Sequence, residues 1–583
     1  MKNLVKFSLV LAAAALTMSG CNCFKKMSKK QDEVTYSCTP KVLTLNNGVV
    51  GADITVNFPA AYFNKKATLR LTPVIVFEGG EVVGTPKYVQ GEKVNDNYTV
   101  ISSENGNTYT QHVEFPYDDR MAESELRVLI ECKCNGADEY VMYNASTGKP
   151  VTKEEAAVLA DPKSAEAVAL RAQCGVFIAE GVNTMQKDFN FGDETSMAGN
   201  DYKRTTSAVE KAEILYKINS SVVNKKALKE NAKLAEVEQN AIANKENERI
   251  AQNLYVNGYA SPDGPEKFND KLSNARSESG RKAIEQVLAD HGFNIDAAGY
   301  GEDWEGFKEM VEKSDIRDKD LILQVLSMYD SSAERETQIK NMSSVYGELK
   351  EDILPQLRRA QLINSMEITG KSDAEMMALV NGGKLDELDN EELLHIADLI
   401  DDAALRAKVL DYTAKKYNDS RAYTNLGATY LQMGEAEKSL AALKEAVKLG
   451  GNTQALNSNL ALANLAAGNV DEAKKYAAAA DAQTQSLIAA AQGDYAAAAT
   501  KLDGYNAAVA AVMNNDLSAA KKALAGEKSA DADYLRAVIA TKEGDMKAAA
   551  AQLKAAVAKD SGLMKKASKD VNLKPLFKSG FKF

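Results

Sequence analysis

The residues of this sequence with the clearest spacing for chemistry lie in one stretch, Asn257–Arg276, which reads NGYASPDGPEKFNDKLSNAR. Asp263 falls in a tight turn bounded by glycines, and Arg276 falls on the helix that this turn feeds. A guanidinium whose position is fixed can bind a carboxylate through two parallel hydrogen bonds. The chemistry indicated by this stretch is therefore the binding of a charged ligand.

The elements that would position these residues alternate along the chain. Apolar runs predict strands and amphipathic stretches predict helices. In order, we expect a strand, a helix, a strand, a helix and a strand at Ala212–Ile218, Lys225–Arg249, Leu254–Tyr259, Pro265–His291 and Asn294–Gly299. The polar, glycine-containing stretch Phe191–Thr206 before them is interpreted as a linker.

The stretch resembles the signature of the OmpA-like peptidoglycan-binding domain, in which a strand and a glycine-bounded loop precede N-x-x-L-S-x-x-R on a helix. Four residues fall on that pattern in order, namely Asn269, Leu272, Ser273 and Arg276. The resemblance implies a central OmpA-like α/β sandwich over residues 205–370, which contains a helical insertion.

The resemblance also implies a ligand. In OmpA-like domains a helix Arg and a loop Asp together bind diaminopimelate of the peptidoglycan stem, through its carboxylate and its ammonium respectively. Arg276 matches the Arg, whereas Ser261 stands at the position of the family Asp, with Asp263 two residues further on. We expect peptidoglycan binding by Arg276, Asp263, Ser261 and Asn269. The alternative for Arg276 is a salt bridge within the domain, for instance to Asp263 or Asp270.

Two later segments extend this resemblance. Gly301–Ser314 (GEDWEGFKEMVEKS) and Leu354–Ala360 (LPQLRRA) are similar to an extension found in OmpA-like proteins of Bacteroidetes. The helices between them would form the insertion, and a last strand is expected near Arg359–Ile368. Trp304, the only Trp of the chain, is expected to pack this extension onto the domain. Stacking against a ligand is its alternative role.

Residues 35–192 carry the alternation of short β-strands. Asp53–Phe58 and Thr68–Thr72 alternate polar and apolar residues, and glycine-containing turn signals separate such runs. An antiparallel β-sandwich is the fold class that this pattern favours. A helical insertion at Glu154–Arg171 and a strand at Gly175–Gly181 are expected within it.

Cysteines Cys132 and Cys134 belong to the alternating run Leu126–Cys134, so buried small apolar side chains are expected there. Disulfides remain open, because an exported protein can form them. Cys-x-Cys on a strand lacks zinc spacing, and the chain has only three histidines. We therefore expect no metal site and no cofactor.

Residues 371–583 are rich in Ala and Leu with helical periodicity, and they are similar to tetratricopeptide repeats. The first unit carries the repeat spacing at Tyr423, Leu426, Gly427, Tyr430, Ser439, Leu443 and Ala446. Gly434 and Gly468 lie one 34-residue period apart (468 − 434). The resemblance implies an all-α solenoid whose concave surface recruits other proteins. A generic Ala-rich helical bundle is the alternative.

The N-terminus predicts export. Lys2 and Lys6 precede an apolar run, and Met18-Ser19-Gly20-Cys21 resembles a bacterial lipobox. This implies a signal peptide over residues 1–20, lipidation of Cys21 with several acyl chains, and a flexible tether over residues 21–34. We expect a lipid anchor in the outer membrane, on its periplasmic face, with the cell surface as the alternative.

Composition limits the remaining functions. The net charge of −11 without a basic block in the body argues against nucleic acid as a partner. No G-x-S-x-G, H-E-x-x-H, P-loop or G-x-G-x-x-G motif is present, so we expect no enzyme. The sequence thus predicts an envelope lipoprotein that links the envelope to peptidoglycan and scaffolds envelope proteins through its repeats. The alternative is an OmpA-like domain without peptidoglycan binding that serves the assembly of a surface, secretion or adhesion complex.

Overall fold

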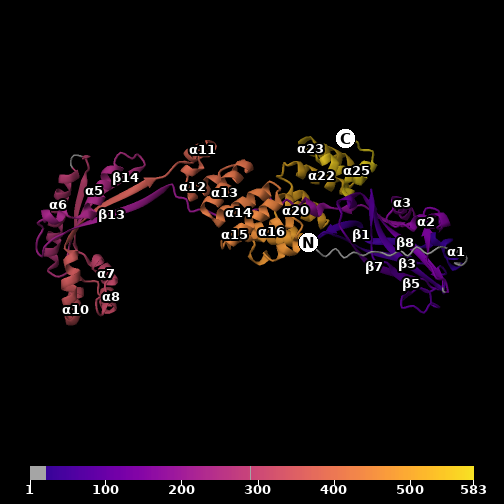
Figure 1. Cartoon of the computed structure of the whole chain (residues 1–583), viewed down its shortest axis with the longest axis horizontal. Coiled ribbons are helices and arrows are strands. Elements are labelled where there is room, and N and C mark those ends of the chain that lie inside the picture. Colours follow the sequence, from indigo (N-terminus) through magenta and orange to yellow (C-terminus); the bar gives the residue numbers. More distant parts are fainter. Residues whose placement is uncertain (1–21, 135, 289–290) are drawn as a thin grey trace. The chain divides into compact units, whose positions relative to one another are not determined.

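The computed structural model describes residues 22–134, 136–288 and 291–583 (Figure 1). These residues form two compact units. The first joins the residues up to Asn200 with Ala397–Phe583, and the second is Asp201–Ile396. The predicted signal peptide and the predicted lipidation site, Cys21, lie outside the described residues.

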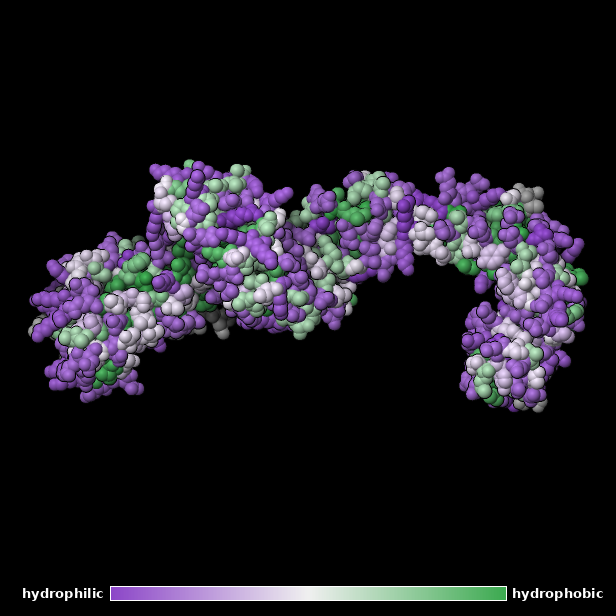
Figure 2. Space-filling view, turned by 180° about the vertical axis from the view of Figure 1, so that it is seen from behind, coloured by the Kyte–Doolittle hydropathy of each residue, from purple (hydrophilic) through white to green (hydrophobic). Residues whose placement is uncertain are grey.

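Within the described part of the chain, no helix has the length and apolar character needed to cross a membrane. Figure 2 shows hydrophilic residues over most of the visible face, with hydrophobic residues in small patches. Small, scattered apolar patches are ordinary for a protein face in contact with water.

The N-terminal part of the first unit is β-rich, as predicted. One sheet has the order β12-β1-β2-β7, and β3 and β8 lie at the centre of a second sheet that is flanked by shorter strands. The bounds of the main strands are β1 Thr35–Asn46, β2 Val49–Phe58, β3 Ala67–Phe77, β7 Asn107–Pro116, β8 Ser124–Cys134, β11 Val176–Glu180 and β12 Val182–Asn183. The shorter strands are β4 Gly80–Val83, β5 Lys87–Gln90, β6 Thr99–Val100, β9 Val141–Asn144 and β10 Lys149–Pro150. Alternate residues of β2 are buried in a core shared with β3 and β8, which is the periodicity of half-buried strands.

The helical insertion of this part is divided in two. The helical insertion expected over Glu154–Arg171 consists of two helices, α2 at Lys153–Leu159 and α3 at Ala165–Cys174. Pro162 lies in the break, where a proline cannot continue the helix. Ser164 then caps α3 by accepting the amide of Ala167. A second apolar cluster joins these helices to the face of β3 and β8 that points away from the main core.

The expected flexible tether over residues 21–34 is wrong for the part that the structure describes. Helix α1 spans Asn22–Ser28 and a 3₁₀ turn spans Gln31–Glu33. Phe24 and Met27 are each 1% exposed and belong to the core of the β-rich part. Burial of such side chains contributes about 1.5–3 kcal/mol each, which is why these residues fold onto the sheets.

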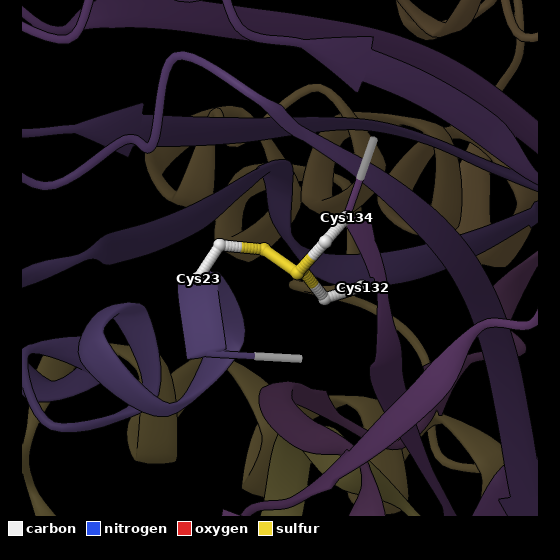
Figure 3. Close-up of side chains that lie close together, drawn as sticks. All are labelled: Cys23, Cys132 and Cys134. Carbon is white, nitrogen blue, oxygen red and sulfur yellow. A yellow bond between two sulfur atoms is a disulfide. The ribbon is translucent and has the colours of Figure 1, made fainter. Parts of the chain in front are cut away.

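A disulfide joins this helix to the strands. Cys23 on α1 is bonded to Cys134 on β8, and Cys132 lies beside the bond (Figure 3). Cys134 is thus not the free apolar side chain that we expected, whereas Cys132 is free and buried. The sulfur atoms of these three residues lie within 4.8 Å of one another. Burial raises the pKa of the Cys132 thiol, and two of the three sulfurs are oxidised, so the cluster offers no thiolate ligands.

The second unit contains a four-stranded sheet in the order β13-β16-β14-β15. Strands β14 and β15 are parallel, and the other neighbours are antiparallel. Its strands are β13 Thr205–Leu215, β14 Ile250–Ala260, β15 Ile295–Glu302 and β16 Arg359–Thr369. Its helices are α4 Lys225–Lys229, α5 Ala232–Asn244 and α6 Glu266–Leu288, and the latter two pack on the sheet through one apolar core.

The alternating order predicted for residues 205–370 is confirmed, with two differences. The first strand begins at Thr205, so it includes the end of the predicted linker. The predicted helix Lys225–Arg249 is divided, because Asn231 caps a new helix by accepting the amide of Leu234. The last strand near Arg359 is present as expected.

Glycines let α6 lie directly on the sheet. A Cβ atom on Gly258 of β14 would lie 2.1 Å from the carbonyl oxygen of Ser273. A Cβ atom on Gly299 of β15 would lie 2.3 Å from the backbone nitrogen of Asn274. No side chain fits at these distances, so both glycines are required by the packing of the helix.

The insertion between β15 and β16 has its own small core. It contains α7 Trp304–Lys313, α8 Lys319–Met328, α9 Ser332–Asn341 and α10 Ser343–Glu348, followed by short turns over Leu349–Leu357. Trp304 packs edge-on against Phe307 in this core. Its indole N–H donates to Ser332 and to Glu302 at the end of β15. The predicted role of Trp304 in packing the extension is confirmed.

Glu238 on α5 makes the stability of this unit depend on pH. The residue is buried, and its Oε1 has no hydrogen-bond partner among the described residues. Burial raises the pKa of Glu238 from 4.5 to about 7. A raised carboxyl pKa adds stability at low pH that is lost as the pH rises through about 7.

Glu238→Gln keeps the shape of the side chain and removes its charge. We expect the variant to be more stable than the wild-type chain at pH 8, with a difference that shrinks towards pH 5. The urea midpoint followed by Trp304 fluorescence measures this. Glu236→Gln on the exposed face of the same helix is the matched control. An equal difference for Glu238→Gln at both pH values would contradict the prediction.

The C-terminal part of the first unit is an array of helical hairpins, as predicted. Its helices are α13 Ala403–Tyr417, α14 Ser420–Gln432, α15 Ala436–Lys448, α16 Gln454–Ala466, α17 Val470–Lys474, α18 Ala482–Ala491, α19 Tyr495–Ala499, α20 Gly504–Met513, α21 Leu517–Ala523, α22 Ala530–Glu543, α23 Met546–Lys559, α24 Leu563–Lys569 and α25 Lys574–Lys578. Helices α14 and α15 pack closely at Gly427, where a Cβ atom would lie 2.5 Å from Leu443. The repeats are uneven because α17 and α19 have only five residues each, whereas α15 has 13.

The domain boundaries differ from the three successive domains that we expected. The β-rich part and the helical array form one compact unit. Lysines near the C-terminus pair with acids of the β-rich part and of the residues after it, in the pairs Lys566–Asp188, Lys569–Glu123, Lys574–Glu180 and Lys578–Glu180. In addition, α11 Asp373–Asn381 and most of α12 Asn390–Asp398 belong to the second unit, not to the solenoid predicted from residue 371.

Candidate functional site

The loop between β14 and α6 brings together residues predicted from the motif. The Ser261 hydroxyl donates to a carboxylate oxygen of Asp263 at 2.5 Å. Asp263 in turn forms an ion pair with Arg358, which precedes β16, at 3.3 Å. Arg358 also donates from Nε to the Ser261 hydroxyl oxygen at 3.3 Å. Ser261 thus positions Asp263, which is the only carboxylate of the loop over residues 261–265.

Arg276 lies inside the domain, with 1% of its surface exposed. Its guanidinium donates to the backbone carbonyls of Ser220, Tyr259 and Lys217 at 3.0, 2.8 and 3.3 Å. The guanidinium also lies over the ring of Tyr216, 5.4 Å from its centroid. Neither of the two salt bridges that we considered, to Asp263 or to Asp270, is among the ion pairs of the described residues. Its partners in the structure are therefore neutral.

The electrostatics of this cluster are unbalanced. Burial, and next to it the positive charge of Arg358, lowers the pKa of Arg276 to about 10, and Tyr216 and Asp263 oppose this shift. The carboxylate of Asp263 is paired with Arg358, so the guanidinium of Arg276 has no carboxylate partner among the ion pairs of the described residues. A buried cation without a full counter-charge is costly unless an anion completes its environment. The cluster is suited to accept a carboxylate.

Asn269 holds the loop in place. Its Nδ2 lies 3.4 Å from each of the carbonyl oxygens of Ser261 and Gly264, and it donates to Glu302 at 2.8 Å. Because Asn269 is buried and these bonds are internal, its role is to position the loop. Ser273, another motif residue, accepts the amide of Gly301 at 2.9 Å and ties α6 to β15.

The acidic pair Glu302 and Asp303 is also used structurally. Asp303 caps α7 by accepting the amide of Gly306, and its carboxylate pairs with Arg359 at 2.7 Å. Glu302 accepts the Asn269 amide and the Trp304 indole N–H. Two carboxylates committed in this way do not face each other across a cleft, as glycoside hydrolysis requires.

The insertion lies next to the loop. Pro262 and residues of the insertion, among them Trp304, Phe307, Ile339 and Tyr346, line one small pocket. The insertion therefore forms a wall beside Ser261 and Asp263.

The sequence patterns assign no role to Arg358. The resemblance covers the stretch LPQLRRA but implies no role for its two arginines. Side chains of successive residues at the start of a strand point to opposite faces. Accordingly, Arg358 reaches Asp263, whereas Arg359 reaches Asp303 and Glu213. The signal in the sequence is the pair of adjacent arginines, Arg358 and Arg359, at the start of the last strand.

A second candidate site lies on the helical array. Residues 184–200, which we name the connector, follow the last strand of the β-rich part and begin with a 3₁₀ turn at Met185–Asp188. Met185 is 2% exposed and Phe189 is 6% exposed, and both belong to the hydrophobic core of the array. The interpretation of Phe191–Thr206 as a simple linker is wrong for its first part, because the connector is bound along the array.

Three asparagines of the array bind the connector backbone. Asn425 on α14 accepts the amide of Ala198 at 2.6 Å and donates to its carbonyl oxygen at 3.1 Å. Asn459 on α16 does the same for Ser196, at 3.0 and 2.7 Å. Asn506 on α20 does the same for Asn190, at 2.8 Å in both bonds. Each amide side chain thus satisfies both backbone groups of one residue.

No protein-family model and no curated protein sequence matches this chain. Solved structures that are similar to it include a tetratricopeptide repeat protein from Parabacteroides merdae, at 14% identity and a TM-score of 0.26, covering 35% of this chain and 96% of that chain. YrrB, described as a TPR protein with an unusual peptide-binding site, is similar at 15% identity and a TM-score of 0.19, covering 34% of this chain and 100% of that chain. Yeast Tom70 is similar at 12% identity and a TM-score of 0.23, covering 59% of this chain and 84% of that chain. At these TM-scores the likenesses support no conclusion about function, which rests on the contacts within this chain.

Proposed function

We propose that this chain is a non-enzymatic, lipid-anchored scaffold protein of the outer membrane whose α/β unit binds peptidoglycan. The observation that carries this proposal is the cluster of Arg276, Arg358 and Asp263, in which Arg358 pairs with Asp263 and the buried Arg276 has no carboxylate partner among the described residues. A ligand with a carboxylate and an ammonium, such as the diaminopimelate of a peptidoglycan stem, complements both signs of charge.

The roles within this site differ from those that the motif alone implies. Arg358 and Asp263 have side chains that are 12% and 16% exposed, so they are the groups that a ligand can reach. Arg276 is buried beneath them, and its charge favours an anion without direct contact. Asp263, held by Ser261, would take the place of the family Asp towards the ammonium.

The remaining parts of the proposal rest on the sequence and on the fold. The lipobox at Met18–Cys21 supports a lipid anchor at Cys21 and a place on the periplasmic face of the outer membrane. The helical array supports a role in binding proteins, since stacked helical hairpins present extended surfaces to partners.

Arg358→Gln tests the binding site. In co-sedimentation of the chain from Asn22 onward with purified insoluble peptidoglycan, we expect affinity to fall about tenfold or more, because a charged hydrogen bond to the ligand is lost. Arg317→Gln, which removes an exposed arginine of the insertion, is the matched control and is expected to bind as the wild-type chain does.

Unchanged retention of Arg358→Gln, or no retention of the wild-type chain, would contradict peptidoglycan binding. The burial of Arg276 and the presence of Ser261 at the family Asp position favour a second candidate function in that case. The α/β unit would then serve the assembly of a surface, secretion or adhesion complex, without a cell-wall ligand.

A further inference from the structure

Three asparagines of the helical array bind the backbone of the connector, not its side chains. The three asparagines that bind its backbone occupy the same place in their hairpins. Each lies nine residues before a turn residue with positive φ, as Asn425 does before Gly434, Asn459 before Gly468 and Asn506 before Asn515 (434 − 425, 468 − 459 and 515 − 506). An equivalent position in successive hairpins aligns these side chains on one face, which we name the asparagine ladder.

The ladder has the form of a binding site for an extended chain. The connector meets Asn506, Asn459 and Asn425 in that order, so it runs opposite to the order of the hairpins. An amide side chain that pairs with a backbone N–H and C=O recognises any extended residue. The intervening hairpin has Thr484 at the same place, nine residues before Gly493 (493 − 484), and its buried hydroxyl has no partner among the described residues.

Specific contacts select the connector for this site. Met185 and Phe189 enter the core of the array. Gly192 lies against α14, where a Cβ atom would be 3.0 Å from the Cα of Gln432 and 3.2 Å from the carbonyl oxygen of Leu431. The Thr195 hydroxyl accepts from Gln432 at 2.8 Å. Backbone recognition and apolar anchors together resemble the way in which a groove binds a peptide.

We propose that the asparagine ladder is a peptide-binding groove that the connector of the same chain occupies and closes. An intramolecular ligand has a high effective concentration, so a free peptide must displace the connector before it can bind. The groove takes an extended peptide with apolar anchors, and it is closed to partners in the resting protein. Proteins bound in the resting state use another surface of the array, in contrast to the expectation from the repeats alone.

Hydrogen exchange of the chain from Asn22 onward tests occupation of the groove. The amide of Ser196 is expected to be protected in the wild-type protein and to exchange about tenfold faster or more in Asn459→Ala, because its acceptor is lost. Asn457→Ala is the matched control, since Asn457 is half-buried on the same helix and its side chain bonds only to nearby residues. Rapid exchange of Ser196 in the wild-type protein, or no change in Asn459→Ala, would overturn the proposal.

A fluorescent peptide with the sequence of residues 183–200 tests the groove itself. The wild-type chain is expected to bind it at least about tenfold more weakly than Met185→Ser/Phe189→Ser, whose connector has lost its apolar anchors. Adding Asn459→Ala to this double variant should abolish the gain, whereas adding Asn457→Ala should not. Slow exchange within α20 and α22 shows that each variant is folded. A folded double variant that binds no peptide would overturn the proposal, and an unfolded one would leave the exchange result to decide it.

Discussion

Gly258→Ala is expected to destabilise the α/β unit by more than about 3 kcal/mol, because overpacking against rigid backbone is among the most costly core changes. The added Cβ would lie 2.1 Å from the carbonyl oxygen of Ser273 and 2.5 Å from the backbone nitrogen of Ser277. Neither atom can move unless α6 leaves the sheet. Trp304 is the only Trp of the chain and lies in this unit, so urea unfolding followed by its fluorescence reports the change.

Gly264→Ala is the matched control for this prediction. It lies in the same motif, and its Cβ would make only an ordinary contact with Asn269, at 3.6 Å. We expect its urea midpoint to stay close to that of the wild-type chain. A Gly258→Ala variant that unfolds at the same urea concentration as Gly264→Ala would show that the helix does not lie as close to β14 as described.

Cys23→Ser or Cys134→Ser is expected to lower the stability of the first unit by about 3–4 kcal/mol, because the disulfide closes a long loop in the unfolded chain. The two cysteines are separated by 111 residues. Scanning calorimetry measures the loss, and the Trp304 transition of the other unit should not shift. Removal of either cysteine should have the same effect, since both changes break one bond.

Reducing agent provides the internal control for the disulfide. It should lower the melting temperature of the wild-type chain to that of Cys23→Ser and should leave Cys23→Ser unchanged. Cys174→Ala removes a buried cysteine that is not in the bond and should keep its response to reducing agent. A wild-type chain whose melting temperature does not respond to reduction would contradict the bond between α1 and β8.

Local sequence patterns predicted most elements of the two units, because they depend on neighbouring residues. The motif around Asn257–Arg276 predicted β14, the loop and α6, since a run of apolar residues, two glycines and a helical pattern are all local signals. The turn glycines Gly434 and Gly468 likewise marked the helical hairpins. The failure at this level was also local, because the predicted helix Lys225–Arg249 is broken at Asn231, where one capping residue outweighs the periodicity around it.

The candidate sites depend on contacts between distant residues, which periodicity does not encode. Arg276 could be placed on its helix from the sequence, but its carbonyl partners at Lys217 and Ser220 lie in the segment that follows β13. Arg358 reaches Asp263 only because β16 inserts between β13 and β14. The topology of the sheet therefore decided which charged groups share the cluster.

The sequence by itself determined the motif, the elements around it and the β-rich and helical parts, because each of these depends on adjacent residues. Only the tertiary structure decided that Arg276 is buried, that Cys23 pairs with Cys134 and that the connector occupies the asparagine ladder. The ladder contacts join residues 227 to 316 positions apart. The free energy of such contacts depends on how whole elements pack, and a local pattern carries no information about that arrangement.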